Sequence, residues 1–109
     1  MKFNVDLLDS AVEFILQQPI KMQAKIQRTI NLLEEFGWQL PEPHSKKLTG
    51  IKDLYELRVK IGTNICRLFY FHWKEKTYIV TSGYVKKTNK TDKNEIERAI
   101  RLMKQIKGE

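Results

Sequence analysis

Residues 54–71, LYELRVKIGTNICRLFYF, predict a β-hairpin at the centre of the fold. Val, Ile, Tyr and Phe are frequent on both sides of Gly62-Thr63, as is typical of β-strands. Because glycine readily adopts the positive φ that begins a type II′ turn, Gly62 and Thr63 can form a two-residue turn. With this turn Ile61 pairs with Asn64, and the other cross-strand pairs follow from it. A three-residue turn with a bulge would give a different pairing.

The predicted pairing gives the hairpin one apolar face and one charged face. Leu57 lies opposite Leu68 on the apolar face, which we expect to pack against helices. Arg58 lies directly opposite Arg67 on the charged face, where cross-strand Cβ atoms are ~5 Å apart. Like charges at this separation destabilise a sheet, so the pattern predicts a compensating group beside the two arginines.

Two groups can supply this compensation. Glu56 is a diagonal neighbour of Arg67 in the predicted sheet, and a carboxylate of the same chain is the structural explanation. A bound phosphate is the functional explanation, because a guanidinium group donates paired hydrogen bonds to phosphate oxygens. The sequence leaves both explanations open.

The segments on either side of the hairpin predict further elements. A short strand is expected at residues 3–6, and Ser10 with Glu13 forms a capping-box pattern that predicts the start of a helix. Pro19 interrupts that helix, and Gly37 is expected to end the next one. Apolar residues at helical spacing mark the buried sides of the second and last helices. They are Met22, Ile26, Ile30 and Leu33 in the second helix, and Ile96, Ala99, Ile100, Met103 and Ile106 in the last.

Together these elements predict an α+β fold in which residues 1–109 form one domain. Pro41 and Pro43 indicate a loop before the hairpin, and Asp92 is expected to cap the last helix. The element order is β-α-α-β-β-β-α, with the N-terminal helices and the C-terminal helix packed on a small antiparallel sheet. The three strands after the loop are expected at residues 54–61, 64–72 and 77–86.

The third of these strands extends the charged face. If residues 73–76 form a four-residue loop, Ser82 lies opposite Arg67 and Tyr84 lies opposite Ile65. Basic groups interleaved with an aromatic ring suit a phosphodiester and an unstacked base. Packing of Tyr84 in the core and an ion pair of the arginines with carboxylates of the same chain are the alternative explanations.

Positive charge is concentrated in the second part of the chain. The net charge is +7, with 4 basic and 6 acidic side chains in residues 1–45 and 16 basic and 7 acidic in residues 46–109. A lysine-rich run, residues 86–90, begins at the last residue of the third strand. This distribution favours nucleic acid or an acidic protein as the partner. A solvated lysine surface that keeps the protein in solution is the alternative.

The composition argues against several other classes of protein. No apolar run approaches the ~20 residues that cross a bilayer, and Asn4, Asp6 and Asp9 interrupt the N-terminal segment, so we expect a cytoplasmic protein with no membrane partner. The single cysteine, Cys66, rules out an internal disulfide and falls on the apolar face of the hairpin. The two histidines are far apart and support neither a metal site nor a hydrolase triad. We therefore predict no metal and no cofactor.

Five short segments resemble the RelE/ParE superfamily of bacterial toxins, and most closely its phage-derived, HigB-like branch. They are Lys47-Leu48-x-Gly50, Leu54-Tyr55-Glu56-Leu57-Arg58, Cys66-Arg67-Leu68-Phe69-Tyr70, Gly83-Tyr84-Val85-Lys86-Lys87-Thr88 and Glu95-Ile96-Glu97-Arg98-Ala99. These segments cover most of residues 46–101. The resemblance lies in their combined order, because each segment alone is a weak signal.

The resemblance implies the toxin of a type II toxin–antitoxin system, neutralised by an antitoxin encoded beside it. In much of this family the toxin enters the ribosomal A site and cleaves mRNA, and by this resemblance it would act without a metal, using the RNA 2′-hydroxyl as the nucleophile. The antitoxin would be acidic and contain a helix-turn-helix, and operator DNA would bind through the antitoxin. Members of the ParE branch inhibit DNA gyrase instead. A non-enzymatic growth inhibitor and an inactive RNA-binding relative are therefore the alternatives.

The resemblance also implies roles for individual residues. Arg67 would stabilise charge on the scissile phosphate, and Arg58 would assist it. Lys86 and Lys87 would hold the RNA backbone, and one of them would help to transfer a proton. A lysine that acts as a base needs a lowered pKa, which crowding by other cations supplies. The other residues expected to contact RNA are Lys46, Lys47, Lys60, Tyr84, Thr88 and Lys90.

Overall fold

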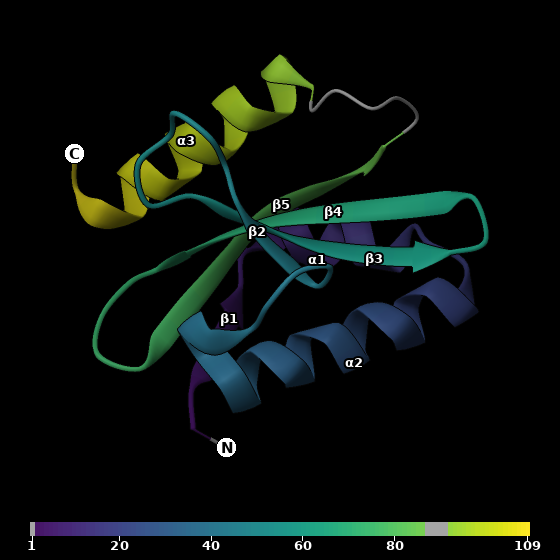
Figure 1. The fold of residues 1–109 in the computed structure, drawn as a ribbon. Coiled ribbons are helices and arrows are strands. Elements are labelled where there is room, and N and C mark those ends of the chain that lie inside the picture. Colours follow the sequence, from purple (N-terminus) through teal and green to yellow (C-terminus); the bar gives the residue numbers. More distant parts are fainter. Residues whose placement is uncertain (1, 87–91) are drawn as a thin grey trace.

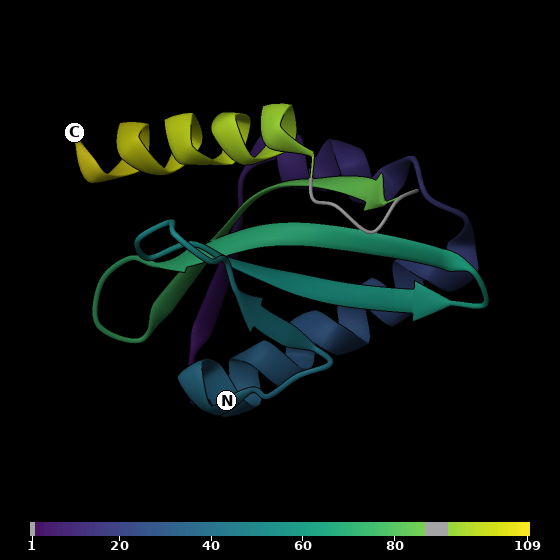
Figure 2. The ribbon, with the colours of Figure 1, turned by 45° about the horizontal axis from the view of Figure 1, so that its top comes forward.

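A five-stranded sheet with helices on both faces forms the centre of the structure, a computed structural model that describes residues 2–86 and 92–109. The strands are β1 (Asn4–Leu7), β2 (Ser45–Lys47), β3 (Tyr55–Ile61), β4 (Asn64–His72) and β5 (Thr77–Lys86). The helices are α1 (Asp9–Leu16), α2 (Ile20–Phe36), the short 3₁₀ helix η1 (Gly37–Gln39) and α3 (Lys93–Lys107). Helices α1 and α2 cover one face of the sheet and α3 covers the other (Figure 1, Figure 2). The predicted α+β class is confirmed.

The hairpin of β3 and β4 has the predicted pairing. Gly62 has a φ of 59°, and Ile61 pairs with Asn64 across the two-residue turn. Arg58 consequently pairs with Arg67. The local chemistry of the turn therefore places the two arginines opposite each other.

Each face of the sheet carries its own apolar cluster. The apolar face of the hairpin, with Leu57, Cys66 and Leu68, is buried beneath α1 and α2, as predicted. The other face carries Phe69 and Phe71, which pack beneath α3. The expected apolar stripes of α2 and α3 line these two clusters. Part of the charged face is thus covered by α3.

The pairing of β4 with β5 differs from the prediction. Tyr84, and not Ser82, lies opposite Arg67, while Ser82 pairs with Phe69. One residue of this shift arises at the turn, where Tyr78 pairs with His72. A second arises at a bulge between Phe69 and Tyr70. Because two one-residue shifts restore the original alternation, Tyr84 and Lys86 still share the face of Arg67.

The sheet is mixed, so the prediction of an antiparallel sheet is wrong at its first strand. Strand β1 runs parallel to β5, with Asn4 opposite Thr77. Strand β2 pairs antiparallel with β3 in a segment that the prolines led us to predict as a loop. Its sequence, Ser-Lys-Lys, has little strand preference of its own, and its conformation comes from pairing with β3.

The helix ends follow the sequence in part. Gly37 ends α2 with a φ of 55°, and the Asp92 side chain caps α3 by accepting a hydrogen bond from the Asn94 N–H at 2.8 Å. The capping box at Ser10 is not formed, because Leu8 occupies the N-cap position. The Ser10 hydroxyl donates instead to the carbonyl of Thr81, the extra residue of β5 at its bulge. None of the helices in the described ranges has the length and apolar character needed to cross a bilayer.

Candidate functional site

One buried carboxylate lies between the two opposed arginines. Glu56 Oε1 accepts a hydrogen bond from Arg58 Nε at 3.2 Å and another from Arg67 Nη1. The Glu56 side chain is 1% exposed, whereas those of Arg67 and Arg58 are 8% and 25% exposed. Of the two compensating groups that the sequence leaves open, the carboxylate of the same chain is present. The three side chains together keep a net positive charge.

This cluster retains unused hydrogen-bonding capacity. Within the described residues, Glu56 Oε2 and Arg67 Nε are buried and have no hydrogen-bond partner. Most buried polar atoms are paired, and the exceptions recur at functional sites. The Arg58–Glu56–Arg67 cluster therefore keeps one acceptor and one donor that the fold itself does not use.

A basic cleft opens beside this cluster. It has a volume of about 260 Å³ and receives side chains from β2, β3, β4, β5 and the start of α3. The lining residues, which we call the basic cleft, are Lys46, Lys47, Leu48, Thr49, Ile51, Glu56, Arg58, Arg67, Lys86 and Ile96. Five cations against one carboxylate make the cleft suited to an anion such as a phosphodiester.

Lys86 has a lowered pKa in this cleft. Its partial burial is the main cause of a lowered pKa, and the positive charges of Arg67, Arg58 and Lys46 lower the pKa further. Glu56 acts in the opposite direction. The crowding by cations that the sequence predicts is present, but burial contributes more. A lowered pKa makes the neutral amine of Lys86 more accessible for proton transfer.

The structure brings together some of the residues predicted for the site. Lys46, Lys47, Arg58, Arg67 and Lys86 all line the basic cleft. The other residues predicted to contact RNA lie elsewhere in the chain. Lys60 lines a neighbouring cavity of about 290 Å³ that Arg58 and Arg67 also reach. The half-buried Tyr84 ring stacks on Phe69, with ring centroids 5.6 Å apart. Lys87, Thr88 and Lys90 lie outside the described residues.

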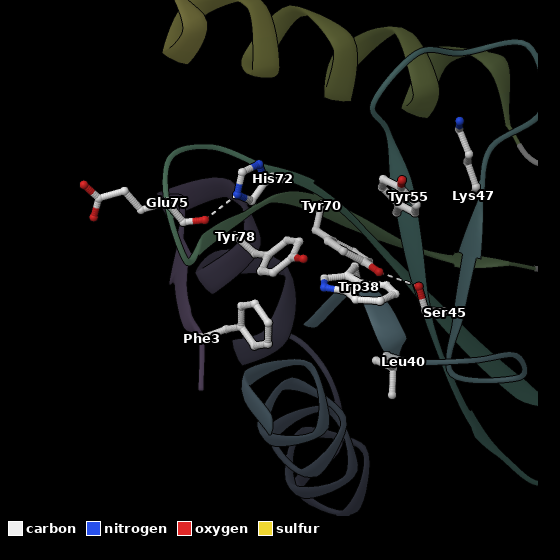
Figure 3. A pocket seen from close by; sticks show the side chains of 10 residues that line it. All are labelled: Phe3, Trp38, Leu40, Ser45, Lys47, Tyr55, Tyr70, His72, Glu75 and Tyr78. Carbon is white, nitrogen blue, oxygen red and sulfur yellow. Dashed lines mark hydrogen bonds between the residues drawn. The ribbon is translucent and has the colours of Figure 1, made fainter. Parts of the chain in front are cut away.

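A second pocket, of about 460 Å³, has no counterpart in the sequence-based prediction. It contains aromatic side chains from segments far apart in the chain, among them Phe3, Trp38, Tyr55, Tyr70 and Tyr78 (Figure 3). Only the Tyr55–Tyr70 pair, a consequence of the hairpin, was accessible to local reasoning. The other rings meet through packing of segments that are far apart in the sequence, which no local pattern predicts.

The fold is similar to that of solved RelE toxins. A mutant of the E. coli toxin RelE in the free state matches with a TM-score of 0.67 and 20% identity, over 93% of this chain and 97% of that chain. RelE in an archaeal RelE–RelB complex from Pyrococcus horikoshii OT3 matches with a TM-score of 0.57 and 22% identity, over 76% of this chain and 93% of that chain. RelE in the intact E. coli RelBE toxin–antitoxin complex matches with a TM-score of 0.58 and 19% identity, over 81% of this chain and 99% of that chain.

Sequence comparison identifies the family. No curated protein sequence matches this chain. The family model described as "Phage derived protein Gp49-like (DUF891)" matches residues 13–104, which include every described residue of the basic cleft. The predicted resemblance to the RelE superfamily is confirmed, while placement in the HigB-like branch stays a prediction. The chain belongs to the Gp49-like family of phage-derived proteins, and it has the fold of the RelE toxins.

Proposed function

We propose that this protein is the toxin of a toxin–antitoxin system and arrests translation by cleaving mRNA on the ribosome. The observation that carries the proposal is the buried Arg58–Glu56–Arg67 cluster at the base of the basic cleft. Solved RelE toxins share the fold, and two of them are seen in complexes with RelB. A cytoplasmic location beside the ribosome is part of the proposal.

The cleft provides the groups that metal-free RNA cleavage needs. The 2′-hydroxyl gives up its proton as its oxygen attacks the adjacent phosphorus, and the bond from phosphorus to the 5′-oxygen breaks. The leaving 5′-oxygen takes up a proton, so a cyclic phosphate and a 5′-hydroxyl result. Negative charge on the non-bridging oxygens increases in the transition state, and donors fixed in a poorly hydrated site stabilise it. Arg67 is the principal donor in this scheme because it is the more buried arginine, and Arg58 assists it.

Lys86 is the described residue best suited to move a proton. Its lowered pKa increases the fraction of neutral amine at a given pH. Lys86 also lines the same cleft as Arg67. Lys46 and Lys47, which are adjacent in β2, would contact the RNA backbone. Glu56 is a positioning residue, since it holds both guanidinium groups in place. Tyr84, Lys60 and the lysine-rich run after β5 remain predicted RNA contacts.

The proposed partners are the cognate antitoxin, the ribosome and mRNA. An acidic antitoxin segment would complement the basic cleft electrostatically. Operator DNA would bind through the helix-turn-helix of the antitoxin. The cleft offers positive charge to either an acidic peptide or RNA, so antitoxin binding over it would exclude RNA.

The test is to map mRNA 5′ ends in a translating extract with and without the protein. We expect new ends that require ribosomes, and Arg67→Ala should reduce their formation by about 100-fold or more. Arg67→Lys keeps the charge but loses the planar fork, and it should recover only a small part of the activity. Arg28→Ala removes an exposed arginine of α2 outside the cleft and should leave cleavage unchanged.

Two results would contradict the proposal. Full cleavage by folded Arg67→Ala would remove the arginine cluster from the mechanism. Intact mRNA with arrested replication would indicate a gyrase inhibitor of the ParE type. Thermal unfolding of each variant separates loss of the site from loss of the fold.

A further inference from the structure

The aromatic pocket on the other side of β2 from the basic cleft has no role in the proposed cleavage. Its lining residues are Phe3, Trp38, Leu40, Ser45, Lys47, Tyr55, Tyr70, His72, Glu75 and Tyr78. Its volume of about 460 Å³ lies within the range of small-molecule binding sites. Figure 3 shows the rings of Trp38, Tyr70 and Tyr78 gathered at its centre, with Tyr55 and Lys47 towards one end.

The rear wall of the pocket is a fixed group of rings. Tyr70 stacks on Tyr55 with centroids 5.5 Å apart and meets the edge of Tyr78 at 5.8 Å. Tyr78 in turn contacts the edges of Phe3 at 5.6 Å and His72 at 5.4 Å. Each ring is held by its neighbours, so the wall needs little rearrangement to receive a ligand.

Trp38 provides an accessible ring beside this fixed wall. Its side chain is 77% exposed although it lines the pocket, whereas Tyr70 and Tyr78 are 3% and 4% exposed. An exposed indole next to buried tyrosines offers a flat surface on which a second aromatic ring can stack. Bases of single-stranded nucleic acids bind proteins in this way, and every base has a face that can stack.

Polar groups accompany the rings. The hydroxyl of Tyr70 is hydrogen bonded to that of Ser45, and His72 Nε2 lies 2.6 Å from the carbonyl oxygen of Glu75. Burial raises the pKa of Tyr70 to about 12, so its hydroxyl stays protonated even at pH 10. Hydroxyl groups beside a stacking surface can form hydrogen bonds with the polar edge of a base. An aliphatic ligand could not form these hydrogen bonds.

Lys47 connects the aromatic pocket with the basic cleft. It lines both, and neighbouring residues of β2 pair with residues of opposite faces of β3. Lys46 pairs with Glu56 of the arginine cluster, whereas Lys47 pairs with Tyr55 of the aromatic wall. A strand of RNA that crosses this edge would therefore meet phosphate-binding groups and a stacking surface in succession.

We propose that the aromatic pocket binds one unstacked base of the RNA strand whose backbone occupies the basic cleft, with Lys47 contacting the phosphate between them. The inference rests on the proposed function, because it takes the RNA in the cleft as given. It adds a base-binding subsite on the face opposite the cleavage site. This subsite increases affinity for single-stranded RNA through stacking.

The test measures binding without cleavage. The probe is a short 2′-O-methyl oligoadenylate, which lacks the nucleophilic hydroxyl. The control strand has the same backbone but no bases. Anisotropy of a dye attached to each strand measures the affinity of every variant. Trp73→Phe leaves Trp38 as the single tryptophan, so its fluorescence also reports on the pocket. We expect the oligoadenylate to quench Trp38, and Trp38→Ala to weaken its binding about tenfold. Trp38→Phe should bind the oligoadenylate about twofold more weakly than the wild type. The abasic strand should bind all variants equally.

A matched control is Phe36→Ala, which removes an exposed aromatic ring of α2 that does not line the pocket. It should bind the oligoadenylate as the wild type does. Trp38→Ala should also unfold at the temperature of the wild type, because the removed side chain is mostly exposed.

The outcomes separate this inference from the proposed function. Equal binding of the oligoadenylate by Trp38→Ala and the wild type, or no binding by either, would overturn the subsite. Unchanged RNA binding together with weaker capture of the purified antitoxin by Trp38→Ala would make the pocket a protein-docking site and also overturn it. If Trp38→Ala binds the oligoadenylate tenfold more weakly while the wild type cleaves no mRNA, the subsite is supported and the proposed reaction is refuted.

Discussion

Arg58 and Arg67 lie opposite each other on β3 and β4 and donate hydrogen bonds to the same atom, Glu56 Oε1. Repulsion between the two cations is therefore offset within the fold, before any ligand binds. Because Glu56 is buried, both guanidinium groups are held in place independently of RNA. Donors fixed in advance lose little conformational freedom on binding, which favours stabilisation of a transition state.

Glu56→Gln should destabilise the protein by about 2–4 kcal/mol, because removing one partner from a buried ion pair leaves the other charges uncompensated. The amide keeps the shape and one acceptor, so the loss stays below that of a complete deletion. Urea unfolding measures the change. Glu35→Gln, at an exposed position of α2, should change the free energy of unfolding by less than about 0.5 kcal/mol. Equal stability of the two variants would contradict a structural role for Glu56.

Lys86→Met should make the protein slightly more stable and much less active. Because its pKa is lowered, the Lys86 ammonium is less favourable in the folded chain than in the unfolded chain. The unfolded state binds more protons between the two pKa values, so the contribution of this site to stability increases as pH rises through that alkaline range. At pH 7 the full penalty applies, and removing the charge relieves it.

The expected rise in Tm for Lys86→Met at neutral pH is small, about 2 °C, since Lys86 is only half-buried. Cleavage should decrease by about 100-fold. Lys76→Met, at an exposed position that does not line the cleft, is the control and should change neither. A lower Tm for Lys86→Met would show that its ammonium is favourable in the fold, contrary to the direction of its pKa.

Gly37→Ala should cost about 2–3 kcal/mol of stability, because the positive φ disfavours a side chain and the new Cβ would overlap the Phe3 ring. Gly50→Ala tests the first effect alone. Gly50 has a φ of 78° but no heavy atom within 4 Å of the added Cβ, so a loss of about 1 kcal/mol is expected. Chemical denaturation of the two variants separates steric overlap from backbone strain. Similar losses would mean that Phe3 moves aside freely.

Cys66 should be unreactive towards thiol reagents in the folded protein. Burial raises the pKa of its thiol from 9.0 to about 11, so the thiolate fraction at pH 8 falls about 100-fold. The side chain is also 1% exposed, which blocks the reagent itself. Labelling with a chromogenic disulfide should therefore be complete in urea and far slower in buffer. Rapid labelling in buffer would reveal frequent opening of the sheet from α1 and α2.

The sequence predicts those parts of the fold that depend on local chemistry. Gly62 defines the turn, the turn defines the register, and the register places Arg58 opposite Arg67. The position of Glu56 beside them also follows from this register. The alternation of β3 and the helical spacing of α2 and α3 identify the buried faces for the same reason.

Features that depend on distant segments were not predictable in this way. The bulge of β5 includes Thr81, whose carbonyl is bonded by Ser10, a residue 71 positions earlier in the chain. Strand β2 forms through its partner, and the aromatic pocket requires Phe3 and Trp38 to meet β4 and β5. Within the site, burial lowers the pKa of Lys86 more than the neighbouring positive charges do. Burial requires the assembled fold.

The arrangement of strands also bears on self-association. The sheet keeps its three long strands together and has its shortest strands, β1 and β2, at the two edges. Where β3 extends past β2, the Lys25 side chain donates to the Lys60 carbonyl and the Arg58 N–H donates to the His44 carbonyl at 2.9 Å. The edge formed by β2 and the end of β3 is short and lysine-rich, and its backbone groups are occupied, so it is a poor template for another strand. This edge is therefore disfavoured for edge-to-edge polymerisation with another copy of the chain.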